Sequence, residues 1–195
     1  MADDTLKQAG NIFDSIAKII HDVKSSVDDI TAVVNNINTS RSVVIEVDNN
    51  TSIPLERIGD HHDHGGFVNP LPKRTIDPRS ANVFGTQSLA GSIATGTEGT
   101  ATYTFDGNMM VIHWDNPFIG ENDGDVALSG VRARRYGVLA TIGHQNHSNS
   151  RYEVFEVPSP YSVKNFAREK QVPFLSSLRD LLPGRGGSLR LLMQV

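Results

Sequence analysis

Three histidines lie within residues 60–64 (DHHDH), and they form the first group of side chains that could carry chemistry. Imidazole and carboxylate groups are good ligands for zinc, nickel or copper. In an extended backbone His62 and His64 would point the same way, with His61 on the other side. A metal site needs ligands that converge from separate elements, and nothing in the sequence brings another histidine to this segment. We therefore interpret residues 60–64 as a solvated polar loop and expect no metal.

A second polar group lies at residues 121–125 (ENDGD), directly after Phe118-Ile119-Gly120. Clustered carboxylates beside a glycine can bind calcium. The ligand spacing of an EF-hand is absent and no helical pattern flanks the segment, so we interpret it as a solvated acidic loop.

The sequence lacks the motifs of the common catalytic sites. It contains no GxSxG, no HExxH, no phosphate-binding glycine loop before a helix and no dinucleotide fingerprint. It also contains no cysteine, which excludes thiol catalysis, thiolate metal sites and disulfides. We therefore expect a protein that is not an enzyme and that needs no cofactor.

Residues 1–38 contain no proline and show a helical hydrophobic pattern, because apolar residues recur at steps of three and four. The pattern predicts one long amphipathic helix, roughly 48 Å for about 32 residues. Its apolar stripe could pack on the rest of the protein, form a coiled coil, or insert reversibly into a membrane, and the pattern is compatible with all three. The stripe consists of Leu6, Phe13, Ile16, Ile20, Val23, Val27, Ile30 and Val34.

Residues 39–195 have a different pattern, with short β-branched segments between frequent turns. Asp106-Gly107 between two such segments is a strong hairpin signal. The pattern predicts a mainly β fold, a β-sandwich of about ten short strands, with a helical segment at about 163–182 and a last strand over 188–195. Residues 60–80 are expected to be irregular. The other expected strands are 42–47, 53–58, 82–86, 92–95, 100–105, 109–114, 125–128, 136–142 and 151–157.

An amphipathic helix followed by a cysteine-free β-sandwich resembles the actinoporin family of pore-forming toxins. The junction between residues 34–37 and 41–49 is similar, and so is the central hairpin with residues 94–99 and 106–108. Residues 116–118 and 187–195 add to this resemblance. The segment Trp114–Phe118 is also similar to the aegerolysins, and fungal fruit-body lectins share the sandwich.

The resemblance to actinoporins implies a soluble monomer that binds membrane lipid through loops at one end of the sandwich. The N-terminal helix would then insert into the bilayer and assemble into a pore with copies from other monomers. The alternative is a lectin-like or lipid-binding module whose helix stays docked or mediates self-association. By position, the resemblance implies a headgroup edge formed by Trp114, Asp115, Pro117, Phe118 and Tyr136. The rest of the family's aromatic cage has no counterpart, so another lipid head, a glycan or a receptor could replace phosphocholine.

Charge and hydropathy restrict the partners and the location. The formal net charge is -4 and the isoelectric point is about 5.9, which argues against a nucleic-acid partner. No apolar run approaches the roughly 20 residues of a transmembrane helix. Residues 1–10 are polar and acidic, so no secretory signal is visible. We expect a protein that is released in soluble form, acts at a target membrane, and has membrane lipid, a surface glycan or itself as partner.

Overall fold

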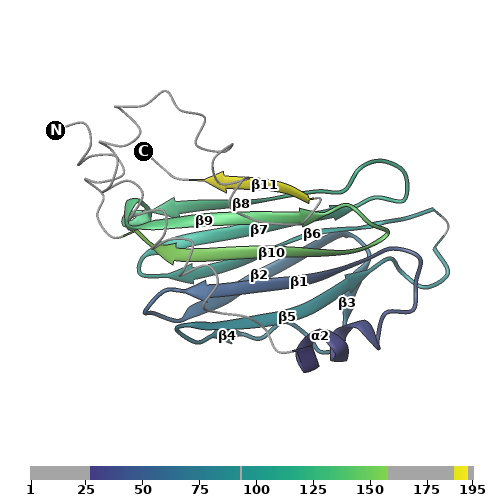
Figure 1. The fold of residues 1–195 in the computed structure, drawn as a ribbon, viewed down its shortest axis with the longest axis horizontal. Coiled ribbons are helices and arrows are strands. Elements are labelled where there is room, and N and C mark those ends of the chain that lie inside the picture. Colours follow the sequence, from purple (N-terminus) through teal and green to yellow (C-terminus); the bar gives the residue numbers. More distant parts are fainter. Residues whose placement is uncertain (1–26, 93, 158–186, 193–195) are drawn as a thin grey trace, which may run out of the picture.

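Two β-sheets pack face to face and enclose the core (Figure 1). The computed structural model describes residues 27–92, 94–157 and 187–192. Sheet A has the strand order β11–β9–β10–β1–β5–β3: β11 (Gly187–Leu192), β9 (Tyr136–Gly143), β10 (His147–Glu156), β1 (Ser42–Asn50), β5 (Ser80–Gln87) and β3 (Gly66–Val68). Sheet B has the order β4–β2–β6–β7–β8: β4 (Thr75–Ile76), β2 (Leu55–His64), β6 (Thr97–Phe105), β7 (Asn108–Asn116) and β8 (Asp123–Gly130). The mainly β, two-sheet expectation is confirmed.

The core forms because every second side chain of the central strands points between the sheets. In β6 and β7 the buried and partly exposed positions alternate along the whole strand. Tyr103, Ile112 and Trp114 from sheet B meet Val43 and Ile45 from sheet A in one apolar cluster. The outward positions of these two strands carry the polar side chains that matter for the site.

The turn between β6 and β7 is the hairpin that the sequence predicts. Asp106 and Gly107 both have positive φ, 46° and 71°. This backbone matches the twist of two antiparallel strands, and glycine adopts it without a steric cost. The hairpin fixes the register of the two strands, so that Glu98 lies directly opposite Asp115.

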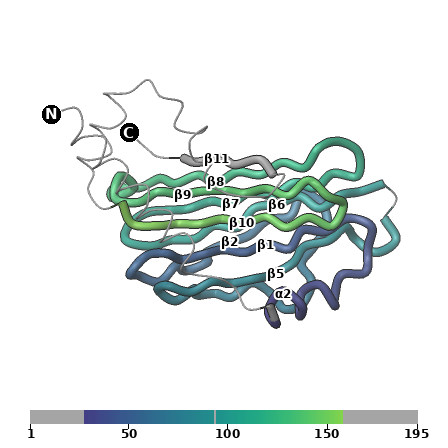
Figure 2. The backbone as a smooth tube through the Cα atoms, in the orientation of Figure 1, coloured from purple at the N-terminus to yellow at the C-terminus, as the bar shows by residue number. Residues whose placement is uncertain are grey.

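Strand β1 pairs with β10 in parallel and with β5 antiparallel, so its two neighbours come from distant parts of the sequence. Ser42 lies beside His147 on one side and beside Gln87 on the other. The long strands run along the length of the molecule, and connecting loops gather at its two ends (Figure 2).

The helix α2 (Val27–Val34) is the described part of the helix that the sequence predicts over 1–38. It packs on the outer face of sheet A, where Val33 is fully buried against Val68 and Val83. Ile30 and Val34 of the predicted stripe are 39% and 49% exposed. The other predicted stripe residues, Leu6, Phe13, Ile16, Ile20 and Val23, lie outside the described residues, so the long helix has no support here. Within the described part of the chain, no helix has the length and apolar character needed to span a bilayer.

Two local expectations differ from the structure. Residues 60–80 are not simply irregular, since β2 continues to His64 and β3 and β4 follow. The expected strand over 53–58 covers only the first part of β2, because few of the later side chains are buried and backbone pairing with β6 holds them in the sheet. Residues 92–95 were expected to be a strand, but they lie in the connection between β5 and β6, where Ala94 has a φ of 56°. The helical segment at 163–182 lies outside the described residues, whereas β11 confirms the last strand over its described range.

Candidate functional site

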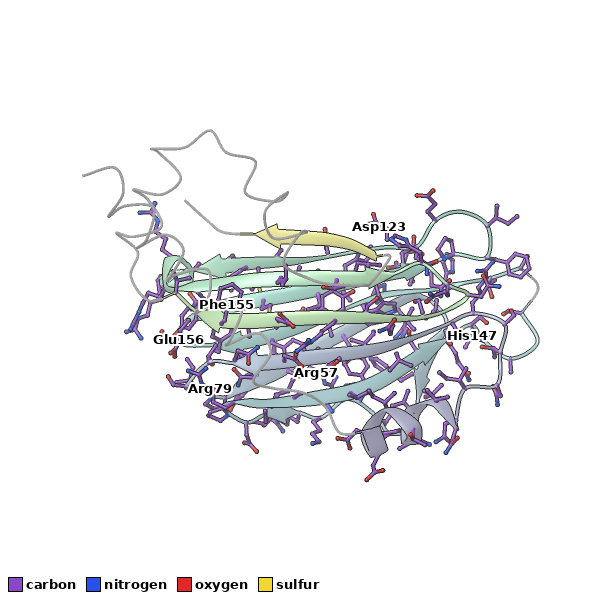
Figure 3. The ribbon with its side chains drawn as sticks, viewed as in Figure 1. Arg57, Arg79, Asp123, His147, Phe155 and Glu156 are labelled. Atoms are coloured by element: carbon purple, nitrogen blue, oxygen red, sulfur yellow. The ribbon has the colours of Figure 1, made fainter. Side chains whose placement is uncertain are left out.

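Three loops lie together at one end of the sandwich, and we call their described residues 88–92, 94–96, 117–122 and 144–146 the loop end. They connect β5 to β6, β7 to β8 and β9 to β10. The buried amide of Asn116 ties this end together, because it donates hydrogen bonds to the backbone oxygens of Ser42 and Asn146, both at 3.0 Å. Figure 3 places His147 and Asp123 near this end. The loops are therefore held in fixed positions by the strands behind them.

The loop end exposes three large apolar side chains. Ile119 is 85% exposed, Leu89 is 60% exposed and Phe118 is 38% exposed. Arg41 fixes the segment that carries two of them, because its guanidinium donates to the Phe118 carbonyl oxygen at 2.5 Å and lies 5.4 Å from the Phe118 ring centre. The same guanidinium donates to the side-chain oxygen of Asn146. The loop end thus presents apolar side chains on a braced backbone.

A hollow of about 370 Å³ opens beside these side chains. Residues 94–98 form one side of it and residues 117–119 form the other. His64 and Asp115 complete the lining. The hollow therefore combines an aromatic ring, aliphatic carbon and carboxylates, which is a suitable lining for a small polar group with a positive charge.

The carboxylates of the hollow lie in a row across sheet B. Glu98 on β6 is opposite Asp115 on β7, and Asp115 is opposite Asp123 on β8. Burial raises the pKa of Asp115, and the neighbouring Glu98 carboxylate raises it further. The Nε2 atom of His113 lies 3.8 Å from Glu98 Oε1. Because like charges oppose each other here, a bound cation would lower the electrostatic energy of this row.

The headgroup residues implied by the family resemblance fall into two groups. Asp115, Pro117 and Phe118 line the hollow. Trp114 does not reach the surface, since it is fully buried beside His62, Phe67 and Phe84.

Tyr136 is 5% exposed and lies at the opposite end of the sandwich. Its hydroxyl donates to Asp106 Oδ2 at 2.7 Å. Burial and this hydrogen bond raise the pKa of Tyr136 to about 12. Its role is therefore to support the hairpin turn.

Sequence reasoning missed Leu89, Ile119, Glu98 and Arg41. Ile119 had a usable signal, because an isolated apolar residue between Phe118 and a glycine in a polar stretch is a candidate for an exposed loop tip. Arg41 lies about fifty residues before Leu89 and Glu98, and only the fold brings it to their end of the sandwich.

The histidines of residues 60–64 lie in β2, and they do not converge. The pairing register of β2 with β6 shifts between His62 and His64, so the two side chains do not point the same way as they would in a regular strand. The ring of His62 contacts Phe67 and Trp114, with ring centroids at 4.3 and 5.4 Å, whereas His61 and His64 are exposed. Burial lowers the pKa of His62. Among the described residues, no three histidine, aspartate or glutamate side chains come together in a way that could hold a metal ion, and this applies to residues 121–125 as well.

Searches with family models and with the sequences of curated proteins give no match. Comparison with solved structures gives matches. The crystal structure of a lipid-binding protein, Nakanori, superposes with a TM-score of 0.58 at 16% identity, over 80% of this chain and 86% of that chain. RahU, crystallised in complex with a Tris molecule, superposes with a TM-score of 0.52 at 9% identity, over 63% of this chain and 99% of that chain. At these identities the likeness shows a common fold, a β-sandwich that occurs in a lipid-binding protein.

Proposed function

We propose that this protein binds the surface of a lipid membrane through its loop end and catalyses no reaction. The observation that carries the proposal is the exposed pair Phe118 and Ile119 at an acidic hollow, with the exposed Leu89 on a neighbouring loop of the same end. Burying one such side chain fully in an apolar environment stabilises a complex by ~1.5–3 kcal/mol. The likeness in fold to a lipid-binding protein supports the same conclusion. A protein of this kind would act at the surface of a target membrane after release in soluble form.

The hollow suggests which part of a lipid is recognised. Glu98 and Asp115 give it a negative lining, and the Phe118 ring, which already lies 5.4 Å from the Arg41 guanidinium, adds apolar surface. The ammonium group of phosphatidylcholine fits the negative lining with its charge and the apolar surface with its methyl groups. We infer that headgroups with an ammonium group bind better than headgroups without one.

Flotation with vesicles tests the proposal. The full chain is mixed with phosphatidylcholine vesicles, and the bound fraction is measured for the natural protein, for Ile119→Ser and for Ile58→Ser. Ile58 is the matched control, because it is 60% exposed but lies on the outer face of β2, away from the loop end. The proposal expects about tenfold weaker binding for Ile119→Ser, corresponding to ~1.4 kcal/mol, and no change for Ile58→Ser. Equal binding by all three proteins would contradict it.

Two conservative substitutions test whether the hollow recognises the ammonium group of the lipid headgroup. Glu98→Gln and Asp115→Asn remove the negative charges of the hollow and keep the side-chain shapes. Both should weaken binding to phosphatidylcholine, and neither should weaken binding to vesicles of phosphatidylglycerol. Binding only to vesicles that carry glycolipids would identify a glycan partner instead.

We also propose a second stage in which the protein assembles with copies of itself and permeabilises the membrane. It is supported by the apolar stripe of residues 6–34 and by the exposed Ile30 and Val34 on α2. Dye release from vesicles measures this stage separately from binding. A full-length variant with Ile16→Asp and Ile20→Asp should bind normally but release no dye. Binding by the natural protein without any release would restrict the function to lipid binding.

A further inference from the structure

The end of the sandwich opposite the loop end carries a short turn with three arginines, Val131–Arg135, which we call the arginine turn. It joins β8 to β9 and contains the 3-10 helix η1 (Ala133–Arg135). The arginine turn is braced rather than loose. The backbone N–H of Arg132 donates to Asn108 Oδ1 at 3.0 Å, and the Arg132 guanidinium binds Asp106 in the hairpin turn.

Positive charge is in excess at this end. Arg132 and Arg135 share one carboxylate, Asp106, and Arg79 faces Glu156 at 3.8 Å. Figure 3 places Arg79 and Glu156 together at this end. Arg134 is exposed and forms no ion pair with a described residue. With the exposed Asp77, two residues before Arg79, four arginines lie against three carboxylates, a local excess of one positive charge, although the whole chain has a net charge of -4.

An exposed apolar residue lies beside these charges. Val131 is 89% exposed, which is more than any other exposed large apolar side chain of the described residues, and it extends over the turn at Gly107. Met109 at the start of β7 is 43% exposed. An aliphatic side chain flanked by arginines fits the interface of an anionic membrane, where phosphate groups lie just above hydrocarbon. A nucleic acid would use the arginines but would leave Val131 exposed to water.

We propose that the arginine turn is a second membrane-binding surface, which recognises anionic phospholipids. It lies on the far side of the molecule from the loop end, because the nine residues of β7 run from one end to the other, about 30 Å at ~3.3 Å per residue. One flat bilayer cannot contact both ends at once in an upright orientation. The protein therefore bridges two bilayers, and this part of the inference rests on the proposed function of the loop end.

Flotation with vesicles that contain one third phosphatidylserine tests the arginine turn. The measurement uses Ile119→Ser as the background, so that the loop end contributes little. Adding Arg134→Gln should weaken binding about fivefold, the effect of one arginine near an anionic surface, and adding Val131→Ser should weaken it further. The matched control is Ala127→Glu, which changes the net charge by the same amount at an exposed position in the middle of β8. It should leave binding within a factor of two.

The outcomes separate this inference from the proposed function. If Arg134→Gln and Val131→Ser bind like their background, the arginine turn is not a membrane surface. If the variants instead abolish a concentration-dependent mass in solution without vesicles, or release a bound DNA duplex, the partner is a second copy or a nucleic acid and the lipid assignment is wrong. If only the loop end loses its contribution, the bound fraction falls with phosphatidylcholine vesicles and not with anionic vesicles.

Light scattering tests whether the protein bridges two bilayers. The natural protein should cluster the anionic vesicles. Either Ile119→Ser or the double variant Arg134→Gln with Val131→Ser should prevent the clustering. An absence of clustering with the natural protein would refute bridging.

Discussion

Asp48 on β1 and Glu153 on β10 lie side by side on the outer face of sheet A, and their exposed fractions are only 0% and 2%. Arg151 binds both, with its Nε atom 2.5 Å from Asp48 Oδ2 and 2.8 Å from Glu153 Oε1. Glu46 is a third carboxylate, 3.8 Å from the same nitrogen. Within the described part of the chain, Asp48 Oδ1 and Glu153 Oε2 accept no hydrogen bond. One guanidinium therefore serves three carboxylates, and two of these are desolvated.

This arrangement makes the stability of the protein depend on pH. Burial raises the pKa of Asp48 from 3.8 to about 7 and that of Glu153 from 4.5 to about 8, against the opposing effect of Arg151. The folded protein therefore keeps protons that the unfolded chain releases, so the free energy of unfolding falls as the pH rises from about 4 to 8. A pKa difference of one corresponds to ~1.4 kcal/mol, which gives about 4 kcal/mol for Asp48. The two carboxyls share Arg151, so their joint contribution is less than twice this amount.

Urea unfolding at pH 5, 6, 7 and 8 measures the effect. We expect the free energy of unfolding of the natural protein to decrease steadily over this range. Asp48→Asn should reduce the change of the free energy of unfolding with pH by about half, because the amide has no proton to lose. Asp77→Asn, at an exposed position, is the control and should follow the natural protein. A free energy of unfolding that rises towards pH 8, or an Asp48→Asn variant as pH-dependent as the natural protein, would refute the reasoning.

Three further perturbations test the fold behind the loop end. Gly99→Ala should lower the free energy of unfolding by ~1–3 kcal/mol, because a Cβ atom there would lie 2.3 Å from the His61 carbonyl oxygen. Gly59 has open space around it, so Gly59→Ala should lower the free energy of unfolding far less in the same urea titration. The fluorescence of Trp114, the single tryptophan, should resist iodide quenching equally with and without vesicles, because the ring is fully buried, and protection gained only on vesicles would place it at the membrane. Asn116→Ala should lower stability by ~1–3 kcal/mol and weaken vesicle flotation, since its amide joins β1 to the loop at 144–146, and a variant unchanged in both would contradict that role.

The two-sheet architecture could be predicted because its strands carry strong local signals. β6 and β7 alternate regularly, and Asp106-Gly107 has the sequence of a tight hairpin turn. The part of β2 after Ile58 lacked such a signal, because it exposes most of its side chains and depends on β6 for pairing. The prediction of a strand over Ser92–Thr95 was wrong, because the composition suits a strand but Ala94 has a left-handed backbone.

The candidate site could be predicted only in part. Asp115, Pro117 and Phe118 followed from the resemblance to known families, and all three line the hollow. Trp114 shared the same segment, yet alternation along β7 turns its side chain into the core and turns Asp115 outwards.

The rest of the site depends on contacts between distant segments. Arg41, directly before β1, reaches Asn146 and the Phe118 carbonyl oxygen because β1 pairs in parallel with β10, a contact between residues about a hundred positions apart. No local pattern contains that pairing, so these residues could not be joined to the site from the sequence.

The most direct test of the central claim is flotation of the full chain with phosphatidylcholine vesicles, comparing the natural protein with Phe118→Ala/Ile119→Ser and with the control Ile58→Ser. We expect the natural protein and the control to float with the vesicles. The loop-end variant Phe118→Ala/Ile119→Ser should stay in solution with its fold intact. If the loop-end variant floats as well as the natural protein does, the loop end is not the membrane-binding surface and the proposed function is wrong.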